Sequence, residues 1–190
     1  MAQVDKERWD IKHSKNMMPQ EPIKLVKDYV HLATKKQALD VACGNGRHSR
    51  YLASIGFEVD ALDISSIAIE QLQGVSHIHT TEVDFDTYTL EKNKYDLIVC
   101  TYYLERKLFP QFEGALKKNG ILIFETFLHN TLNERAPSNL AFILEEEELE
   151  TYFDHRFELL HISKWWDKDY QGYKVMKSSM VARKKSREME

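Results

Sequence analysis

The sequence is poor in the residues that hold small secreted or metal-bound domains together. Only two of its 190 residues are cysteines, Cys43 and Cys100, and they show no paired metal-ligand spacing. Two isolated cysteines do not supply a disulfide framework or a cysteine-based zinc site. Both stand at the ends of apolar stretches, so we expect small buried side chains in a reducing compartment and no metal.

Long apolar runs and an excess of positive charge are also missing. No stretch approaches the roughly 20 apolar residues that span a bilayer, and residues 1–6 lack the apolar core of a signal peptide. The formal net charge of -4 offers no general attraction for phosphate backbones or anionic lipids. We therefore expect a cytoplasmic protein that binds neither membranes nor nucleic acids.

The sequence does contain enough apolar material for one core. Hydrophobic residues make up 43% of the chain, and the length is that of an ordinary domain. We expect a single domain over residues 1–190. Residues 1–20 would form a polar N-terminal arm, and residues 184–190 a disordered tail.

Short apolar strands alternate with helical patterns from residue 23 onward. We expect helices over residues 23–32, 47–55, 66–72, 109–118 and 145–153, and strands over 37–43, 57–62, 75–83, 95–101, 121–127, 157–162 and 173–182. This alternation predicts an α/β fold with a doubly wound, mostly parallel sheet. Ligands of such sheets bind at the carboxyl ends of strands, where the strand order reverses.

A glycine pair marks the turn after the first predicted strand. Gly44 and Gly46 flank Asn45, and glycines there let the backbone approach a ligand closely. A dinucleotide fingerprint would want a third glycine where Ser49 stands. Asp40 inside the strand would repel a pyrophosphate but could receive an ammonium group, so the turn favours a ligand with a cationic amino-acid moiety.

Two further acidic residues follow the next two predicted strands. Asp63 stands where a carboxylate can accept hydrogen bonds from both hydroxyls of a ribose. Asp84, followed by Phe85, stands where it can accept from an adenine amino group, although Asp86 competes for that role. These positions predict a nucleoside lying across the strand ends.

Residues 38–48, with the sequence ALDVACGNGRH, resemble motif I of class I S-adenosylmethionine-dependent methyltransferases. Within that class the chain is most similar to the short tellurite-resistance type, which has a Trp-Asp arm before motif I. The resemblance implies a seven-stranded sheet with an antiparallel last strand, S-adenosylmethionine as cofactor with S-adenosylhomocysteine as product, and a small-molecule acceptor. The cofactor-binding residues that it implies are Asp40, Ala42, Cys43, Gly44, Asn45, Gly46, Asp63, Ile64, Asp84, Phe85 and Cys100.

Candidate substrate residues come from the arm and from the end of the fourth predicted strand. They are Trp9, His13, Tyr102, Tyr103 and Arg106. Trp9 and His13 either fold over the cofactor as a lid or pack on the sheet. Glu125 and the loop over residues 129–140 leave the same edge of the sheet and are the next candidates. We name no catalytic residue, because orientation alone can drive transfer from an activated methyl group.

Two other functions remain open. One is methylation of RNA or protein by the same core, which calls for a basic surface around Arg47, Arg50, Lys107, Lys117 and Lys118. The other is binding of the cofactor without transfer of a methyl group, since no general base stands out. Neither the acceptor atom nor the oligomeric state follows from the sequence.

Overall fold

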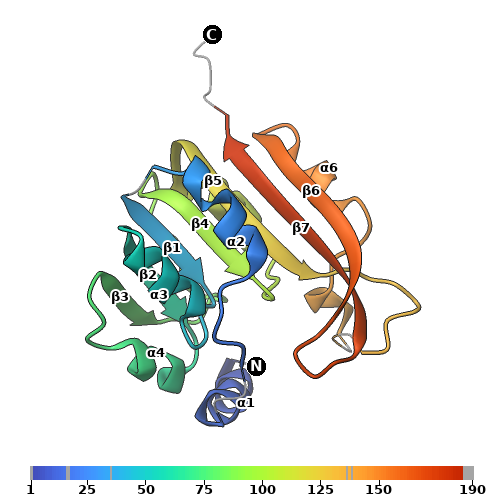
Figure 1. Ribbon diagram of the computed structural model, residues 1–190, viewed down its shortest axis with the longest axis horizontal. Helices are drawn as coiled ribbons and strands as arrows, with labels where there is room; N and C mark the ends of the chain where they lie inside the picture. Colours follow the sequence, from blue (N-terminus) through green and yellow to red (C-terminus); the bar gives the residue numbers. More distant parts are fainter. Residues whose placement is uncertain (1, 16–17, 35, 136, 138, 186–190) are drawn as a thin grey trace.

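The computed structural model describes residues 2–185 except residues 16, 17, 35, 136 and 138. Within these residues, one twisted sheet has the strand order β3-β2-β1-β4-β5-β7-β6 (Figure 1). The strands are β1 Gln37–Val41, β2 Glu58–Asp63, β3 Ile78–Glu82, β4 Tyr95–Thr101, β5 Leu116–Phe127, β6 Phe157–Lys168 and β7 Lys174–Lys184. β7 runs antiparallel to both of its neighbours, and the pairs from β3 to β5 are parallel. The predicted fold class is confirmed.

Helices cover both faces of this sheet (Figure 1). They are α1 Ala2–Ser14, α2 Lys24–Tyr29, the 3-10 turn η1 Val30–Leu32, α3 Arg47–Ser54, α4 Ser66–Leu72, α5 Leu108–Ala115, the 3-10 turn η2 Leu140–Phe142 and α6 Glu148–Phe153. Leu97 and Val99 of β4 face the core shared with α2 and α3, while Ile98 faces the core shared with α5 and α6. Alternate residues of a strand point to opposite faces, so burial on both faces explains why β4 is apolar throughout.

The strand order indicates at which edge of the sheet a ligand would bind. β1 pairs with β2 on one side and with β4 on the other, so the order of the chain reverses between β1 and β4. The residues that follow these strands meet at one edge of the sheet, which is where ligands of doubly wound sheets bind.

Several predicted boundaries were wrong. The fifth helix ends at Ala115, not at residue 118, because Leu116 is fully buried in β5 and Lys117 turns to Asp96 at 2.9 Å. The β6–β7 hairpin is longer than predicted, and Lys184 still belongs to β7. The predicted tail otherwise falls mostly on residues 186–190, which lie outside the described residues.

The N-terminal arm is also more regular than its polar sequence suggests. Residues 2–14 form the helix α1, which lies across the end of the sheet (Figure 1). No helix in the described part of the chain is long and apolar enough to cross a membrane.

Candidate functional site

The loop between β1 and α3 turns sharply at the carboxyl end of β1. Its residues Ala42, Gly44 and Gly46 take left-handed conformations with φ of 52°, 55° and 74°. Glycine adopts such angles readily because it has no Cβ. At Gly46 a Cβ would also lie 2.3 Å from Leu72 Cδ2, so the close packing of α4 on the turn requires glycine there.

Asp63, the last residue of β2, joins this loop to the start of α4. Its Oδ2 accepts a hydrogen bond from the Gly44 amide at 2.8 Å, and its Oδ1 accepts one from the Ser65 amide at 2.9 Å. Burial raises the pKa of Asp63, while the two amide donors and His13 act against this rise. The glycine turn and the acidic residue therefore meet directly.

Asp40 is buried inside β1 and faces the start of α3. Its Oδ2 accepts hydrogen bonds from the Ser49 amide at 3.0 Å and from Ser49 Oγ at 2.6 Å. Burial raises the pKa of Asp40 to about 7, although the bonds from Ser49 oppose the rise. Asp40 thus anchors the first turn of α3, whatever else it binds.

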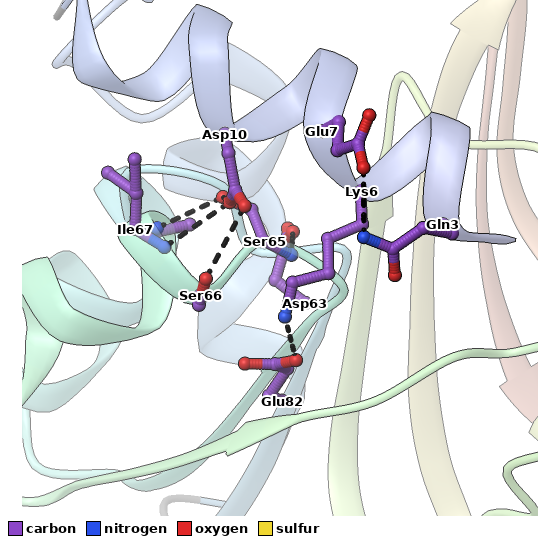
Figure 2. A network of polar contacts seen from close by, with 10 residues as sticks. Gln3, Lys6, Glu7, Asp10, Asp63, Ser65, Ser66, Ile67 and Glu82 are labelled. Carbon is purple, nitrogen blue, oxygen red and sulfur yellow. Dashed lines mark hydrogen bonds and ion pairs between the residues drawn. The ribbon is translucent and has the colours of Figure 1, made fainter.

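Helix α1 is held over this edge of the sheet by polar contacts (Figure 2). Lys6 forms an ion pair with Glu82 at the end of β3. Asp10 accepts hydrogen bonds from Ser65 Oγ at 2.5 Å and from the Ile67 amide at 3.4 Å, at the N-terminus of α4. A carboxylate is favourable there because the first amides of a helix lack intrahelical partners.

His13 is the point where α1 meets the glycine turn. Its ring is stacked with that of Trp9 at 5.9 Å between centroids, and its Cε1 lies 3.1 Å from where a Cβ of Gly44 would stand. The side chain is 4% exposed, and Nδ1 has no hydrogen-bond partner among the described residues. Burial lowers the pKa of His13, while Asp63 and Asp10 oppose this. A buried polar atom without a partner is costly.

Asp84, Phe85 and Cys100 lie farther along the same edge. Asp84 Oδ1 accepts a hydrogen bond from the Asp86 amide at 2.9 Å. The ring of Phe85 is buried, with its centroid 5.5 Å from that of Tyr103. Cys100 is buried, as predicted, and its Sγ lies 3.5 Å from the Tyr103 carbonyl oxygen. Phe85 and Cys100 therefore belong to the core as much as to the site edge.

A second group of polar side chains surrounds Tyr102 at the ends of β4, β5 and β7. We name Arg47, Tyr102, Glu125 and Lys177 the Tyr102 cluster. Tyr102 donates a hydrogen bond to Glu125 Oε1 at 2.6 Å and accepts one from Lys177 Nζ at 3.1 Å. The Arg47 guanidinium carbon lies 5.6 Å from the centroid of the Tyr102 ring. Burial raises the pKa of Glu125, while Tyr102, Lys177 and Arg47 act against that rise.

The sequence model of the tellurite resistance protein TehB family matches residues 8–171 of the chain. That range includes the second half of α1, the glycine turn, Asp63 and most of the Tyr102 cluster. The chain belongs to the TehB family. The resemblance inferred from motif I is thereby confirmed.

Other TehB-family and methyltransferase proteins share the fold. TehB from Haemophilus influenzae superposes with a TM-score of 0.72 at 23% identity, over 85% of this chain and 61% of that one. A methyltransferase from Methanosarcina mazei, described as S-adenosylmethionine-dependent, gives 0.69 at 19% identity, over 87% and 99%. The ubiquinone biosynthesis O-methyltransferase of Burkholderia multivorans is 31% identical over 126 residues, which are 57% of this chain and 52% of the relative. The chain thus spans about half the length of the curated relatives that it matches.

In this TehB-family chain, Arg106 does not join the Tyr102 cluster. Its guanidinium donates to both carboxylate oxygens of Glu148, at 2.6 and 2.9 Å, and to the carbonyl oxygens of Ala141 and Ile143. Four of its five N–H donors are thus engaged. Arg106 therefore fastens the segment before α6 to the end of β4.

Lys177 and its ion-pair partner Asp167, 2.8 Å away, were missed by the sequence reasoning. They lie on β7 and β6, and only the long-range pairing of these strands brings Lys177 to Tyr102. One local signal was available: Lys177 is the lone charged residue in the run over residues 177–182. No three metal-binding side chains gather in the described part of the chain.

Proposed function

We propose that this TehB-family chain is an S-adenosylmethionine-dependent methyltransferase that acts on a small-molecule acceptor. The observation that carries the proposal is the hydrogen bond from the Gly44 amide to Asp63. It joins a glycine turn, where a backbone can approach a ligand, to a carboxylate suited to ribose hydroxyls. The reversal of strand order at β1 and β4 supports this choice of edge.

The residues around the turn fit this cofactor. The ring of His13 fills the Cβ side of Gly44, with Cε1 3.1 Å from where a Cβ would stand, and its Nδ1, which has no partner among the described residues, offers a hydrogen bond to a polar ligand. Asp63 would receive the ribose hydroxyls, and Asp40 the ammonium group. Adenine would lie by Asp84 and Phe85. The remaining proposed contacts are Ala42, Cys43, Asn45, Gly46, Ile64 and Cys100.

When bound, the cofactor supplies a methyl group already activated on a sulfonium. The chain then needs to orient the acceptor, exclude water and accept a proton when the acceptor loses one. We assign orientation to Tyr102 and Tyr103, and coverage of the cofactor to Trp9 and His13 of α1. Alignment of this kind can lower barriers by up to roughly 7–11 kcal/mol.

A small acceptor is favoured over RNA. Of the basic residues that an RNA-binding surface would use, Arg50 donates to the Gln71 carbonyl oxygen at 2.7 Å, and Lys117, at the start of β5 and away from the glycine turn, is paired with Asp96. Lys107 faces Asp86 at 3.9 Å. Partnered cations and a net charge of -4 offer little to a phosphate backbone.

Calorimetric titration with S-adenosylmethionine, S-adenosylhomocysteine and NAD tests the proposal. We expect saturable binding of the first two and none of NAD. Methyl transfer is then sought by incubating the protein with labelled S-adenosylmethionine and a panel of phenols, thiols and amines. Binding of NAD alone, or of none of the three, would contradict the assignment of the glycine turn.

A further inference from the structure

Arg47 is the one member of the Tyr102 cluster whose charge is not matched by a hydrogen bond. It is the first residue of α3 and is half-buried. Among the described residues, none accepts a hydrogen bond from its guanidinium, which instead faces the Tyr102 ring at 5.6 Å. Burial lowers the pKa of Arg47, opposed by Tyr102, Asp40 and Glu125. A guanidinium taken out of water is normally paired with an anion, because it has five donors and no acceptor.

The other charged groups of the cluster already have partners. Lys177 donates to Tyr102 Oη and to Asp167 at 2.8 Å, and Glu125 accepts from Tyr102. Lys177 is therefore engaged, and no hydrogen bond joins Glu125 to Arg47 among the described residues. Because burial favours the neutral form of Glu125, its carboxyl repels an incoming anion less than an ordinary glutamate would.

Tyr102 is held rigidly in an unfavourable conformation. Its φ of 57° is left-handed, which is rare for an aromatic residue. Its amide donates to the Glu125 carbonyl oxygen at 2.7 Å, and its hydroxyl donates to the Glu125 side chain. Strain of this kind persists only where the surroundings fix it, and it concentrates at ligand sites. The Tyr102 side chain that faces Arg47 is thus fixed in place before any ligand binds.

The strand order places the Tyr102 cluster apart from the residues proposed to bind the ribose. Asp63 and the contacts of α1 lie on β2, β3 and α4. Tyr102, Glu125 and Lys177 follow or lie on β4, β5 and β7, on the other side of β1. A ligand group that reaches Arg47 therefore belongs to the acceptor or to the amino-acid end of the cofactor, not to the nucleoside.

We propose that the Arg47 guanidinium binds a carboxylate of the bound small molecules, and that this carboxylate belongs to the acceptor. The proposal rests on the proposed function. Two parallel N–H···O bonds from a guanidinium fit the two oxygens of a carboxylate. The acceptor would thus be an organic acid whose nucleophile is set by the anchored carboxylate at a fixed distance from the Tyr102 edge.

The first experiment measures carboxylate binding directly. The protein, alone and saturated with S-adenosylhomocysteine, is titrated calorimetrically with benzoate and with hexanoate, and with benzyl alcohol as the uncharged match. We expect the carboxylates to bind and benzyl alcohol not to bind. Arg47→Met should weaken carboxylate binding at least 10-fold. Arg47→Lys keeps the charge but loses the two parallel N–H donors of the guanidinium, so it should give an intermediate loss.

Arg50→Met is the matched control, because Arg50 lies one turn along the same helix and donates only to the Gln71 carbonyl oxygen. It should bind the carboxylates like the wild type. Melting temperatures of all variants show whether each one is folded. If neither carboxylate binds to the wild type, or if Arg47→Met and Arg50→Met bind them equally, the proposal is overturned.

The second experiment identifies the source of the carboxylate. S-adenosylhomocysteine has a carboxylate, and 5′-methylthioadenosine lacks the amino-acid end. If Arg47→Met leaves the affinities for both nucleosides unchanged, the carboxylate is the acceptor's. If only S-adenosylhomocysteine binds more weakly, Arg47 holds the cofactor instead, and the acceptor assignment is overturned. Failure of the wild type to bind either nucleoside would refute the proposed function, while the titration of the unloaded protein still tests Arg47.

Discussion

The side chain of Asp63 connects the glycine turn to the start of α4. Its two oxygens accept hydrogen bonds from amides 19 residues before it and two residues after it. Losing the carboxylate would leave the buried Gly44 and Ser65 amides without partners, and a ribose without its acceptor. A residue in this position therefore affects both folding and binding, and a useful variant must separate the two.

Asp63→Ala is expected to weaken binding of S-adenosylmethionine by about 10- to 150-fold, from the loss of two hydrogen bonds to a charged group. Calorimetry measures the affinity and thermal unfolding measures the stability. Asp63→Asn keeps one acceptor oxygen, so it should remain folded and still bind more weakly than the wild type. Unchanged affinity in a folded Asp63→Asn protein would remove Asp63 from the ribose site.

His48 links the acid stability of the fold to the same region. It is buried in α3, its Nε2 lies 3.4 Å from the Ile23 amide, which donates to it, and burial lowers its pKa to about 3. In the unfolded chain a histidine has a pKa near 6.5, so the unfolded state takes up protons first as the pH falls. The His48 contribution to stability is therefore present above about pH 6.5 and is lost progressively toward pH 3.

We expect His48→Gln, which cannot be protonated, to lose less stability than the wild type on acidification from pH 7 to pH 4. The linked free energy is at most roughly 5 kcal/mol over the full range from pH 6.5 to pH 3. Urea unfolding at each pH gives the free energy of unfolding of both proteins. If the difference between these two free energies stays constant with pH, His48 is not held neutral in the fold.

At the scale of elements, α1 differs from the other helices in how it is attached. Of its described side chains only His13 is buried, and Val4 and Ile11 are among its most exposed. It is attached by the Lys6–Glu82 ion pair, by the bonds that Asp10 accepts at the start of α4, by a bond from Gln71 to the His13 carbonyl oxygen, and by the His13 ring against Gly44. An element attached by a few polar contacts opens more easily than one attached by apolar burial. Such a helix suits a cover that opens for a ligand.

Asp10→Ala is expected to weaken binding of S-adenosylhomocysteine by roughly 3- to 10-fold, since it removes the acceptor that Ser65 and Ile67 use to hold α1. The melting temperature should change little, because α1 buries almost no apolar surface. Asp5→Ala is the matched control on the same helix, as Asp5 pairs only with Arg8 one turn away. Equal affinities for the two variants would mean that α1 does not cover the cofactor.

The way α1 is attached also explains why the sequence did not predict it as a helix. Sequence patterns reveal helices through an apolar stripe, and α1 has none that the sheet uses. The helical segment over residues 23–32, observed as α2 and η1, was predicted because Leu25, Val26 and Val30 form such a stripe in the core shared with β1, β4 and β5. Similarly, the end of α5 depends on Leu116 packing into the sheet, which is tertiary information.

At the scale of the whole molecule, the central strand β4 carries the core on both faces. Leu97 is fully buried among the side chains of α2 and α3. Leu97→Ala should cost about 2–5 kcal/mol, from lost burial and a cavity, which lowers the melting temperature by roughly 5–15 °C in a chain of this size. Leu140→Ala, at a position that is 59% exposed, should have almost no effect on calorimetric unfolding. Similar losses for both would place β4 outside the cooperative core.

The alternation of strands and helices along the chain and the glycine turn after β1 could be predicted from the sequence because their signals are local. Alternating apolar segments, Gly44, Gly46 and the acidic residues after each strand all lie within short stretches. The Tyr102 cluster could not, because Arg47 and Lys177 are 130 residues apart and meet only when β7 pairs with β5. The roles of individual residues at the site stay predictions until ligand binding is measured.

The position of β7 has a consequence for how the protein is made. β7 lies between β5 and β6, although it leaves the ribosome after both. Until residues 174–184 have emerged, β6 has no partner strand, and the apolar β5 has an open edge that can pair with another chain. The strands from β3 to β4 in the parallel half of the sheet emerge from the ribosome much earlier than β7. A nascent chain stalled in the β6–β7 hairpin would therefore carry a formed glycine turn beside an aggregation-prone edge, the species that a chaperone has to shield.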